Sequence, residues 1–580
     1  MMRDAGTLII LVWAAAVASA QEAAKPCVRE RLDRGLVALP RGGGKVYLGW
    51  RLLEGDPPDA AFNVYRAAGG GAPQKLNAEP IRKTTDFVDE SAPAGPCAYV
   101  VRAVSRSGEG APSPAVPVQP GAAQDYVGFK LDEGIRFQKV GLADLDGDGR
   151  YDFVLKHPDE NVDPYEMYWK KSTNTYKIEG RLHDGRRLWV NDLGWPIERG
   201  IWYSPVVAAD LDGDGKAEVA LKTGEGDPRD PDGRVTAGPE WISVWDGMTG
   251  KELARAPWPP REVAGQQLTY NYSSRNQLTV AYLDGKTPTL IVQRGTYTII
   301  QLVAWQYRNR ALKKVWEWHS DMEAEPKKWR GQGAHSLQAH DIDGDGRDEV
   351  VLGSAVIDEN GKGLWTTRLG HPDHAYVGDI DPSRPGLEIF YGMESRQKEA
   401  NGLCVVDAKT GAILWGHKGA TRHVHGYGLC GDIGPRHPGA EVYSFDTDEK
   451  KSFAKAWLYS ARGELIEEYD KPPKFSRPVY WDADPYRELV CGPRIEKYRG
   501  VVVLPKLEGR VALIADVLGD WREELVMTVP GELRVYTTSI PAEDRRVCLM
   551  QDPVYRATVL AAAQGYFYNP MLSTLPSAGK

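Results

Sequence analysis

The sequence has 580 residues and a formal net charge of -8 at pH 7, with 62 glycines, 40 prolines, 18 tryptophans and 27 tyrosines. This length exceeds what one ordinary hydrophobic core needs, so we expect two or more domains or one large repetitive domain. The acidic balance and the lack of a basic run exclude a general attraction to nucleic acid or to an anionic membrane. Many turn and aromatic residues, with few long apolar helical periods, predict an all-β protein of short strands.

The first 20 residues have the features of a secretory signal peptide. Arg3 precedes an apolar stretch from Leu8 to Val17, and small residues at Ala18 to Ala20 provide a cleavage site. The apolar stretch is too short to span a membrane, and no cysteine stands at the cleavage point. We therefore predict a secreted or periplasmic protein without a membrane anchor.

Residues 27–121 show short alternating strands such as KVYLGWRLL, AFNVYRA and CAYVVRAVS, separated by turn residues. This pattern predicts a β-sandwich of about a hundred residues. Its core aromatic residues are expected to be Trp50, Tyr65 and Tyr99. Cys27 and Cys97 bracket the domain, and they either pair across it or remain separate buried thiols.

From residue 122 onward an acidic turn recurs between two apolar strands. Three full copies of DxDGDGxx[DE] start at Asp144, Asp210 and Asp341, and weaker copies start at Asp284, Asp379, Asp432, Asp482 and Asp516. The starts are 34 to 74 residues apart, which is centred near the length of a four-stranded blade. Because sheets repeated around a ring protect their edges by closing on themselves, we predict an eight-bladed β-propeller over residues 122–580.

Each full copy offers alternate carboxylates and a later acid that can converge on one hard cation, since glycines let the backbone curl tightly. Calcium, which prefers six to eight oxygen ligands, fits better than zinc. A calcium ion in such a turn is expected to be structural, so the chemistry is sought elsewhere. The predicted ligands are Asp144, Asp146, Asp148 and Asp152; Asp210, Asp212, Asp214 and Glu218; and Asp341, Asp343, Asp345 and Glu349.

A collinear series of segments runs from about Val28 to Arg556 and includes LDRGLVALPRGGGKVYLGWRLL, GQGAHSLQAHDIDGDGRDEVVLGS, PRIEKY, LGDWREELV and DPVYR. The series resembles polysaccharide lyase family 11, the rhamnogalacturonan lyases. The resemblance implies an eight-bladed, calcium-loaded propeller behind a fibronectin type III-like sandwich. It also implies cleavage of rhamnogalacturonan I, a pectin, by β-elimination that leaves an unsaturated uronate end.

Such an elimination needs a cation on the uronate carboxylate and a base near the C5 proton. The family pattern places the cation at His335, His371 and Asp373. Imidazole ligands alone would favour a transition metal, whereas the resemblance favours calcium. The alternative is that these histidines only form hydrogen bonds within their blade.

The family pattern also suggests a base, Lys497 in GPRIEKYRG, with an ordinary surface lysine as the alternative. One position departs from the pattern: RHVHGYGLCGDI has Tyr427 where the family has an arginine between two glycines. A tyrosine cannot neutralise a carboxylate, but it can donate or accept a proton, so Tyr427 is a candidate acid or alternative base. Arg422, His425 and Arg494 are candidate substrate-binding residues.

The leading hypothesis is thus a secreted, calcium-dependent lyase whose partner is an acidic polysaccharide, with rhamnogalacturonan I as the first candidate. The change at Tyr427 leaves two alternatives open. One is a lyase that acts on another rhamnose- or uronate-containing polysaccharide. The other is a non-catalytic, calcium-loaded propeller that binds a glycan or a protein partner. We expect a monomer.

Overall fold

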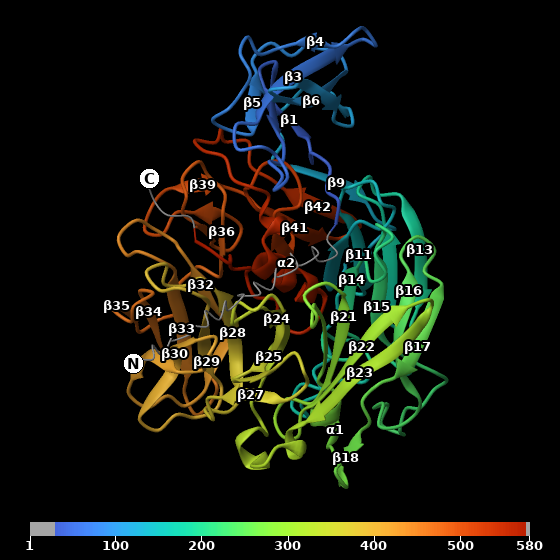
Figure 1. Cartoon of the computed structure of the whole chain (residues 1–580), viewed down its shortest axis with the longest axis vertical. Helices are drawn as coiled ribbons and strands as arrows, with labels where there is room; N and C mark the ends of the chain where they lie inside the picture. The colour runs from blue at the N-terminus through green and yellow to red at the C-terminus, as the bar shows by residue number, and fades with distance from the viewer. Residues whose placement is uncertain (1–29, 576–580) are drawn as a thin grey trace, which may run out of the picture.

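The computed structural model describes residues 30–575 and confirms an all-β protein (Figure 1). The predicted signal peptide at residues 1–20 and Cys27 lie outside the described residues. Cys97 is buried, and no disulfide is present among the described residues. No helix in residues 30–575 is both long enough and apolar enough to cross a membrane.

The N-terminal part forms two small sheets around one core. The first sheet contains β1 (Val37–Gly42), β2 (Lys45–Gly49) and β5 (Asp86–Asp89). The second contains β3 (Ala61–Ala68), β4 (Gln74–Lys75), β6 (Cys97–Ser105), β7 (Gly108–Pro112) and β8 (Val116–Val118). Trp50 and Tyr99 are fully buried in this core, as predicted. The expectation for Tyr65 was wrong: Tyr65 lies on the other face of β3 from Val64 and donates a hydrogen bond to Glu109 over 2.6 Å.

Eight four-stranded antiparallel sheets follow in the described residues. The first four contain β10 (Lys139–Ala143), β11 (Asp152–His157), β12 (Lys177–Arg181) and β13 (Arg187–Asp192); β14 (Val206–Ala209), β15 (Glu218–Gly224), β16 (Glu240–Asp246) and β17 (Glu252–Pro257); β20 (Asn276–Ala281), β21 (Thr289–Arg294), β22 (Gln301–Arg308) and β23 (Ala311–His319); and β24 (Gly333–His340), β25 (Glu349–Gly353), β26 (Ala355–Ile357) and β27 (Gly363–Thr366).

The next three sheets contain β28 (Pro372–Gly378), β29 (Glu388–Met393), β30 (Ala400–Asp407) and β31 (Ile413–Lys418); β32 (Val424–Gly431), β33 (Glu441–Thr447), β34 (Phe453–Tyr459) and β35 (Leu465–Tyr469); and β36 (Arg477–Val479), β37 (Glu488–Val490), β38 (Ile495–Glu496) and β39 (Val502–Leu504). The eighth contains β40 (Arg510–Ala515), β41 (Glu524–Val529) and β42 (Glu532–Tyr536), and its fourth strand is β9 (Tyr126–Lys130). A strand that precedes the first sheet thus completes the last one.

The first strands of the eight sheets lie next to one another. Contacts run from β10 through β14, β20, β24, β28 and β32 to β36, and β10 also contacts β40. Each of the eight predicted acidic turns connects the first strand of one sheet to its second strand. The repeat found in the sequence therefore corresponds to one sheet per acidic turn.

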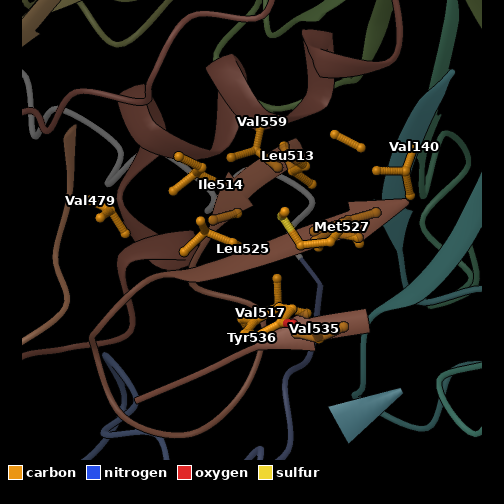
Figure 2. Packing of buried hydrophobic residues seen from close by; sticks show 14 of the residues in the cluster. Val140, Val479, Leu513, Ile514, Val517, Leu525, Met527, Val535, Tyr536 and Val559 are labelled. Atoms are coloured by element: carbon orange, nitrogen blue, oxygen red, sulfur yellow. The ribbon is translucent and has the colours of Figure 1, made fainter. Parts of the chain in front are cut away.

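A short C-terminal helix, α2 (Pro553–Leu560), packs against the first strands of the first four sheets. Asp552 caps this helix by accepting the N–H groups of Val554 and Tyr555. Figure 2 shows Val559 of α2 beside Leu513 of β40, within a core that also includes residues of the first and seventh sheets. The other elements are minor: α1 (Tyr270–Ser273), β18 (Glu262–Val263), β19 (Gln266–Gln267) and four 3-10 turns.

The N-terminal sheets dock on the eighth sheet through buried polar contacts. Tyr47 donates a hydrogen bond to Asp520 over 3.0 Å, and Arg522 donates one to the Tyr47 hydroxyl over 2.6 Å. All three side chains are buried. Because buried polar groups are costly unless they are satisfied, this network fixes how the two parts meet.

Candidate functional site

The predicted site residues divide between the two ends of the first strands. The acidic turns follow the C-terminal ends of these strands, as Asp341 follows β24. His335 instead lies near the start of β24, His371 immediately precedes β28, and Tyr427 lies in the first half of β32. The acidic turns therefore lie at the opposite end of the sheets from His335, His371 and Tyr427.

At the N-terminal ends of the first strands, four side chains converge: His335, His371, Asp373 and Glu394. Their potential ligand atoms all lie within 4.8 Å of one another. The two Nε2 atoms of the histidines are 3.2 Å apart, and Nε2 of His371 is 2.9 Å from Oε2 of Glu394. Oδ1 of Asp373 is 3.2 Å from Nε2 of His335. Glu394 is 22% exposed and the other three are buried, so the histidine cluster, as we call these four residues, opens to solvent at Glu394.

Neighbouring groups orient the ligands of the histidine cluster. Nδ1 of His371 hydrogen-bonds to the carbonyl oxygen of Gly333, so Nδ1 carries the proton and Nε2 presents its lone pair to the cluster. Oδ2 of Asp373 accepts the backbone N–H of Gly426, whereas its Oδ1 accepts no hydrogen bond although it is buried. A buried carboxylate oxygen without a donor, facing imidazole nitrogens, is what a cation site requires.

The electrostatics of the histidine cluster also favour a bound positive charge. Burial acts to raise the pKa of Asp373 and of Glu394, but the neighbouring histidines outweigh it and lower both pKa values. Burial acts to lower the pKa of His335, but the nearby carboxylates of Asp373 and Glu394 outweigh it and raise that pKa. Two ionised carboxylates and two imidazoles make a donor set that fits a divalent cation, because carboxylates suit calcium and imidazoles suit transition metals.

Glu394 was missed by the sequence reasoning. It directly follows β29, the strand that pairs antiparallel with β28, and its neighbour Met393 pairs with Pro372. A hairpin register drawn through the acidic turn at Asp379 would have placed Glu394 beside His371. Its sequence signal was therefore an acid at the far end of the hairpin that carries His371 and Asp373.

The three full acidic turns bring together three of the four predicted ligands in each case. Ligand atoms cluster in the sets Asp144, Asp146 and Asp152; Asp210, Asp212 and Glu218; and Asp341, Asp343 and Glu349. The remaining aspartate of each predicted set instead accepts a hydrogen bond from its own loop. Asp148 and Asp345 accept from the arginine two residues later, and Asp214 accepts the N–H of Lys216. The geometry of the turns fits a cation held by at least three carboxylates.

Tyr427 lies on a bulge in β32. The register between β32 and β33 shifts between His425 and Leu429, and Gly426 and Gly428 adopt φ angles of 82° and 58°. A Cβ atom at Gly428 would come within 2.5 Å of the His374 ring, so the bulge requires glycine there. The bulge leaves the Tyr427 side chain 41% exposed at the rim.

Two of the predicted residues connect β32 to the histidine cluster, His425 directly and Tyr427 through Tyr566. Nδ1 of His425 is 3.1 Å from Oδ2 of Asp373. The ring of Tyr427 lies 4.9 Å from that of Tyr566, and the Tyr566 ring lies 4.7 Å from that of His335. Tyr566 thus lies between Tyr427 and the histidine cluster and forms a wall of the site. The sequence did not point to Tyr566, because it is far from both residues along the chain.

The other three predicted residues have their ion-pair partners elsewhere. Nζ of Lys497 lies 2.5 Å from carboxylate oxygens of both Asp482 and Asp484, in the acidic turn at the opposite end of the seventh sheet. Burial acts to lower the pKa of Lys497, but these two carboxylates outweigh it and raise that pKa, which disfavours a base near neutrality. Arg494 lies 3.4 Å from Glu496, and Arg422 lies 3.3 Å from Glu449.

Comparison with known proteins gives consistent matches over nearly the whole chain. Residues 133–575 match the model of the rhamnogalacturonan lyase family 11 C-terminal domain, and residues 28–119 match that of the rhamnogalacturonan I lyase beta-sheet domain. The rhamnogalacturonan endolyase YesW of Bacillus subtilis is 37% identical over 97% of this chain and 93% of its own length. The exolyase YesX of the same organism is 34% identical over 93% of this chain and 94% of its own length.

Solved structures agree with these matches. The crystal structure of YesW superposes with a TM-score of 0.85 at 36% identity, covering 96% of this chain and 98% of that chain. A family 11 rhamnogalacturonan lyase of Bacillus licheniformis gives a TM-score of 0.85 at 35% identity, covering 96% of this chain and 98% of that chain. The chain therefore belongs to polysaccharide lyase family 11, the rhamnogalacturonan lyases, and is a polysaccharide lyase.

Proposed function

We propose that this enzyme cleaves rhamnogalacturonan I by β-elimination at the histidine cluster, with calcium as the cation. The observation that carries the proposal is the convergence of His335, His371, Asp373 and Glu394 beside an exposed tyrosine, in a member of a lyase family. The relatives named above include an endolyase and an exolyase of rhamnogalacturonan. The activities of these relatives support the substrate assignment.

The reaction requires one proton to leave C5 of a galacturonate and one to reach O4. The electron pair of the C5–H bond forms the C4–C5 double bond, and the C4–O4 bond breaks with its electrons on O4. A divalent cation bound at the cluster supplies charge neutralisation of the uronate carboxylate, which makes the C5 proton more acidic. The ring nitrogens of His335 and His371 and the carboxylates of Asp373 and Glu394 would hold that cation.

Tyr427 is the residue that we assign to proton transfer. Its hydroxyl belongs to a side chain that is 41% exposed at the rim, next to the wall formed by Tyr566. From that position it can donate a proton to O4 as the leaving group departs, or accept the C5 proton. Asp373 orients His425 at the same rim, where His425 can donate a hydrogen bond to the polysaccharide. The assignment of Lys497 as the base stays a prediction.

We infer that the eight sheets are the blades of an eight-bladed propeller that forms a catalytic domain over residues 122–580. Residues 27–121 then form a fibronectin type III-like sandwich. The contacts between successive first strands and the strand exchange by β9 support this arrangement. Calcium at the three full acidic turns would stabilise the blades. Residues 1–20 are proposed to direct export, which predicts that the mature protein begins at Gln21.

The test is an elimination assay on purified protein. Rhamnogalacturonan I and polygalacturonate are incubated with the enzyme, and the ultraviolet absorbance of an unsaturated uronate is followed with and without a chelator. We expect absorbance to rise on rhamnogalacturonan I, to stop with chelator and to return with calcium. Binding of the polymer without any rise in absorbance on either substrate would refute the proposal.

A further inference from the structure

Within residues 30–575, an arginine at the start of the seventh sheet has no acidic partner. Arg477 is the first residue of β36, at the same end of the sheets as the histidine cluster. Its Nη1 donates to the carbonyl oxygen of Phe567 over 2.8 Å, and its guanidinium carbon lies 4.4 Å from the ring centroid of Tyr427. Among the described residues no aspartate or glutamate pairs with it, and Phe567 takes only one of its five N–H groups.

This lack of a carboxylate distinguishes Arg477 from other arginines at this end of the sheets. Arg275 pairs with Asp163 over 2.9 Å, and Arg510 pairs with Asp159 over 3.0 Å. A half-buried guanidinium without a counter-ion is costly for the folded protein, so such a residue is a candidate for binding an anionic ligand. The partner that matches a planar guanidinium is a carboxylate.

Two other first strands also begin with a basic residue. Lys139 is the first residue of β10 and Arg510 the first of β40, so cations begin three first strands, those of the seventh, eighth and first sheets. Within residues 30–575 Lys139 has no acidic partner, and its pKa is lowered by burial and by the charges of Arg477, Lys156 and Arg510. Because its lowered pKa favours a neutral Lys139, and because Arg510 already pairs with Asp159, Arg477 is the charged member of this group that lacks a carboxylate within the described residues.

The position of Arg477 connects it to the site. Its guanidinium stacks on Tyr427, whose ring contacts Tyr566, whose ring in turn contacts His335. The first strands β32, β36 and β40 are also partly exposed at their N-terminal ends, whereas β10, β14, β20, β24 and β28 are buried throughout. The solvent-accessible rim therefore extends from the histidine cluster past Tyr427 to Arg477.

We propose that Arg477 binds a uronate carboxylate of the acidic polysaccharide, using the Tyr427 ring as its platform. The proposal rests on the function proposed above, since it names how that substrate is held. Tyr427 cannot neutralise a carboxylate, whereas the Arg477 guanidinium, which lies 4.4 Å from the centroid of the Tyr427 ring, can. Arg477 is a substrate-binding residue in this account, so its loss weakens binding more than turnover.

The experiment measures binding without turnover. Arg477→Gln and wild type are run by affinity electrophoresis in gels that contain rhamnogalacturonan I or the same polymer after chemical reduction of its carboxyl groups. We expect Arg477→Gln to bind the acidic polymer about tenfold more weakly, because charge-assisted hydrogen bonds are lost, and to bind the reduced polymer as wild type does. Arg499→Gln is the matched control, since Arg499 is exposed and already pairs with Glu467. Kinetics should show a raised KM and a nearly unchanged kcat.

Two results would overturn the proposal. One is an unchanged affinity of Arg477→Gln for the acidic polymer, or an equal loss for both polymers, which would indicate lost packing. The other is a wild-type protein that binds the acidic and the reduced polymers equally well. A wild type that binds the acidic polymer through Arg477 but never produces unsaturated ends would refute the lyase proposal alone.

Discussion

Replacement of Lys497 by alanine tests whether this lysine is a catalytic base or a structural cation that occupies an acidic turn. In the seventh acidic turn, Glu488 accepts the N–H of Trp481 over 3.0 Å, as Glu218 accepts the N–H of Leu211 over 2.8 Å in the second turn. This correspondence aligns Asp482, Asp484 and Glu488 with Asp212, Asp214 and Glu218, and it puts Tyr480 where the full turns have their first aspartate. The Lys497 ammonium lies among acids that correspond to predicted cation ligands.

The size of the effect follows from exposure and geometry. Lys497 is 34% exposed, and Nζ lies 2.5 Å from Asp482 and from Asp484 and 3.8 Å from the buried Glu488. Each partly exposed ion pair contributes at most about 1 kcal/mol after solvent screening. Leaving the buried Glu488 beside two other acids adds repulsion. We therefore expect Lys497→Ala to lower the free energy of unfolding by about 1–3 kcal/mol, which is a shift of about 1–3 °C in Tm for a chain of this size.

The assay is thermal unfolding of wild type and Lys497→Ala in chelator and across a calcium titration. If the ammonium stands in for a metal ion, calcium should raise the Tm of the variant more than that of wild type, and kcat should change little. Lys506→Ala is the control, because Lys506 is an exposed lysine outside the acidic turns. A kcat reduced by about a hundredfold or more at unchanged Tm would refute this reasoning and identify Lys497 as the base.

Three further predictions concern the cluster, the tyrosine and a buried ion network. Glu394→Gln should weaken calcium binding at least tenfold in calorimetry, because it removes a charged ligand; unchanged affinity would exclude Glu394 as a ligand. Tyr427→Phe keeps the ring but removes the hydroxyl, so kcat should fall about a hundredfold or more at a similar KM, whereas an unchanged kcat would exclude proton transfer by Tyr427. Burial acts to raise the pKa of Glu240, but three cations outweigh it and hold that pKa at about 2. Ionised Glu240 therefore stabilises the folded protein above the ordinary pKa of a glutamate, and this stabilisation is lost as the pH falls toward 2. Glu240→Gln should therefore unfold more easily than wild type at pH 7 by about 3–5 kcal/mol, and the difference should shrink below about pH 4; a constant difference would contradict the assignment. The three cations are Lys222, Arg261 and Arg294.

The fold could be predicted from the sequence because its repeat unit is local. Each acidic turn and its two flanking strands lie within 14 to 24 consecutive residues, so both the number of sheets and the approximate position of every turn could be predicted. The start assigned at Asp482 was two residues late, since the structure aligns Tyr480 with the first aspartates. Lys497 contacts the acidic turn at Asp482 from a later hairpin, so the sequence of the turn itself does not predict that a lysine occupies it.

The site was only partly predictable because it is assembled from different sheets. His335, His371 and Asp373 could be found from local motifs, whereas Glu394 depended on a hairpin register. Tyr566 and Arg477 come from segments far from the Tyr427 motif, and their ring contacts with Tyr427 arise only when the first strands are placed side by side.

The proposed elimination breaks the polysaccharide without consuming water. The direct test is to digest rhamnogalacturonan I in water enriched in oxygen-18 and to analyse the new chain ends by mass spectrometry. We expect unsaturated uronate ends and no heavy oxygen at the cleaved linkage. Saturated ends that carry heavy oxygen would show hydrolysis and would refute the proposed elimination.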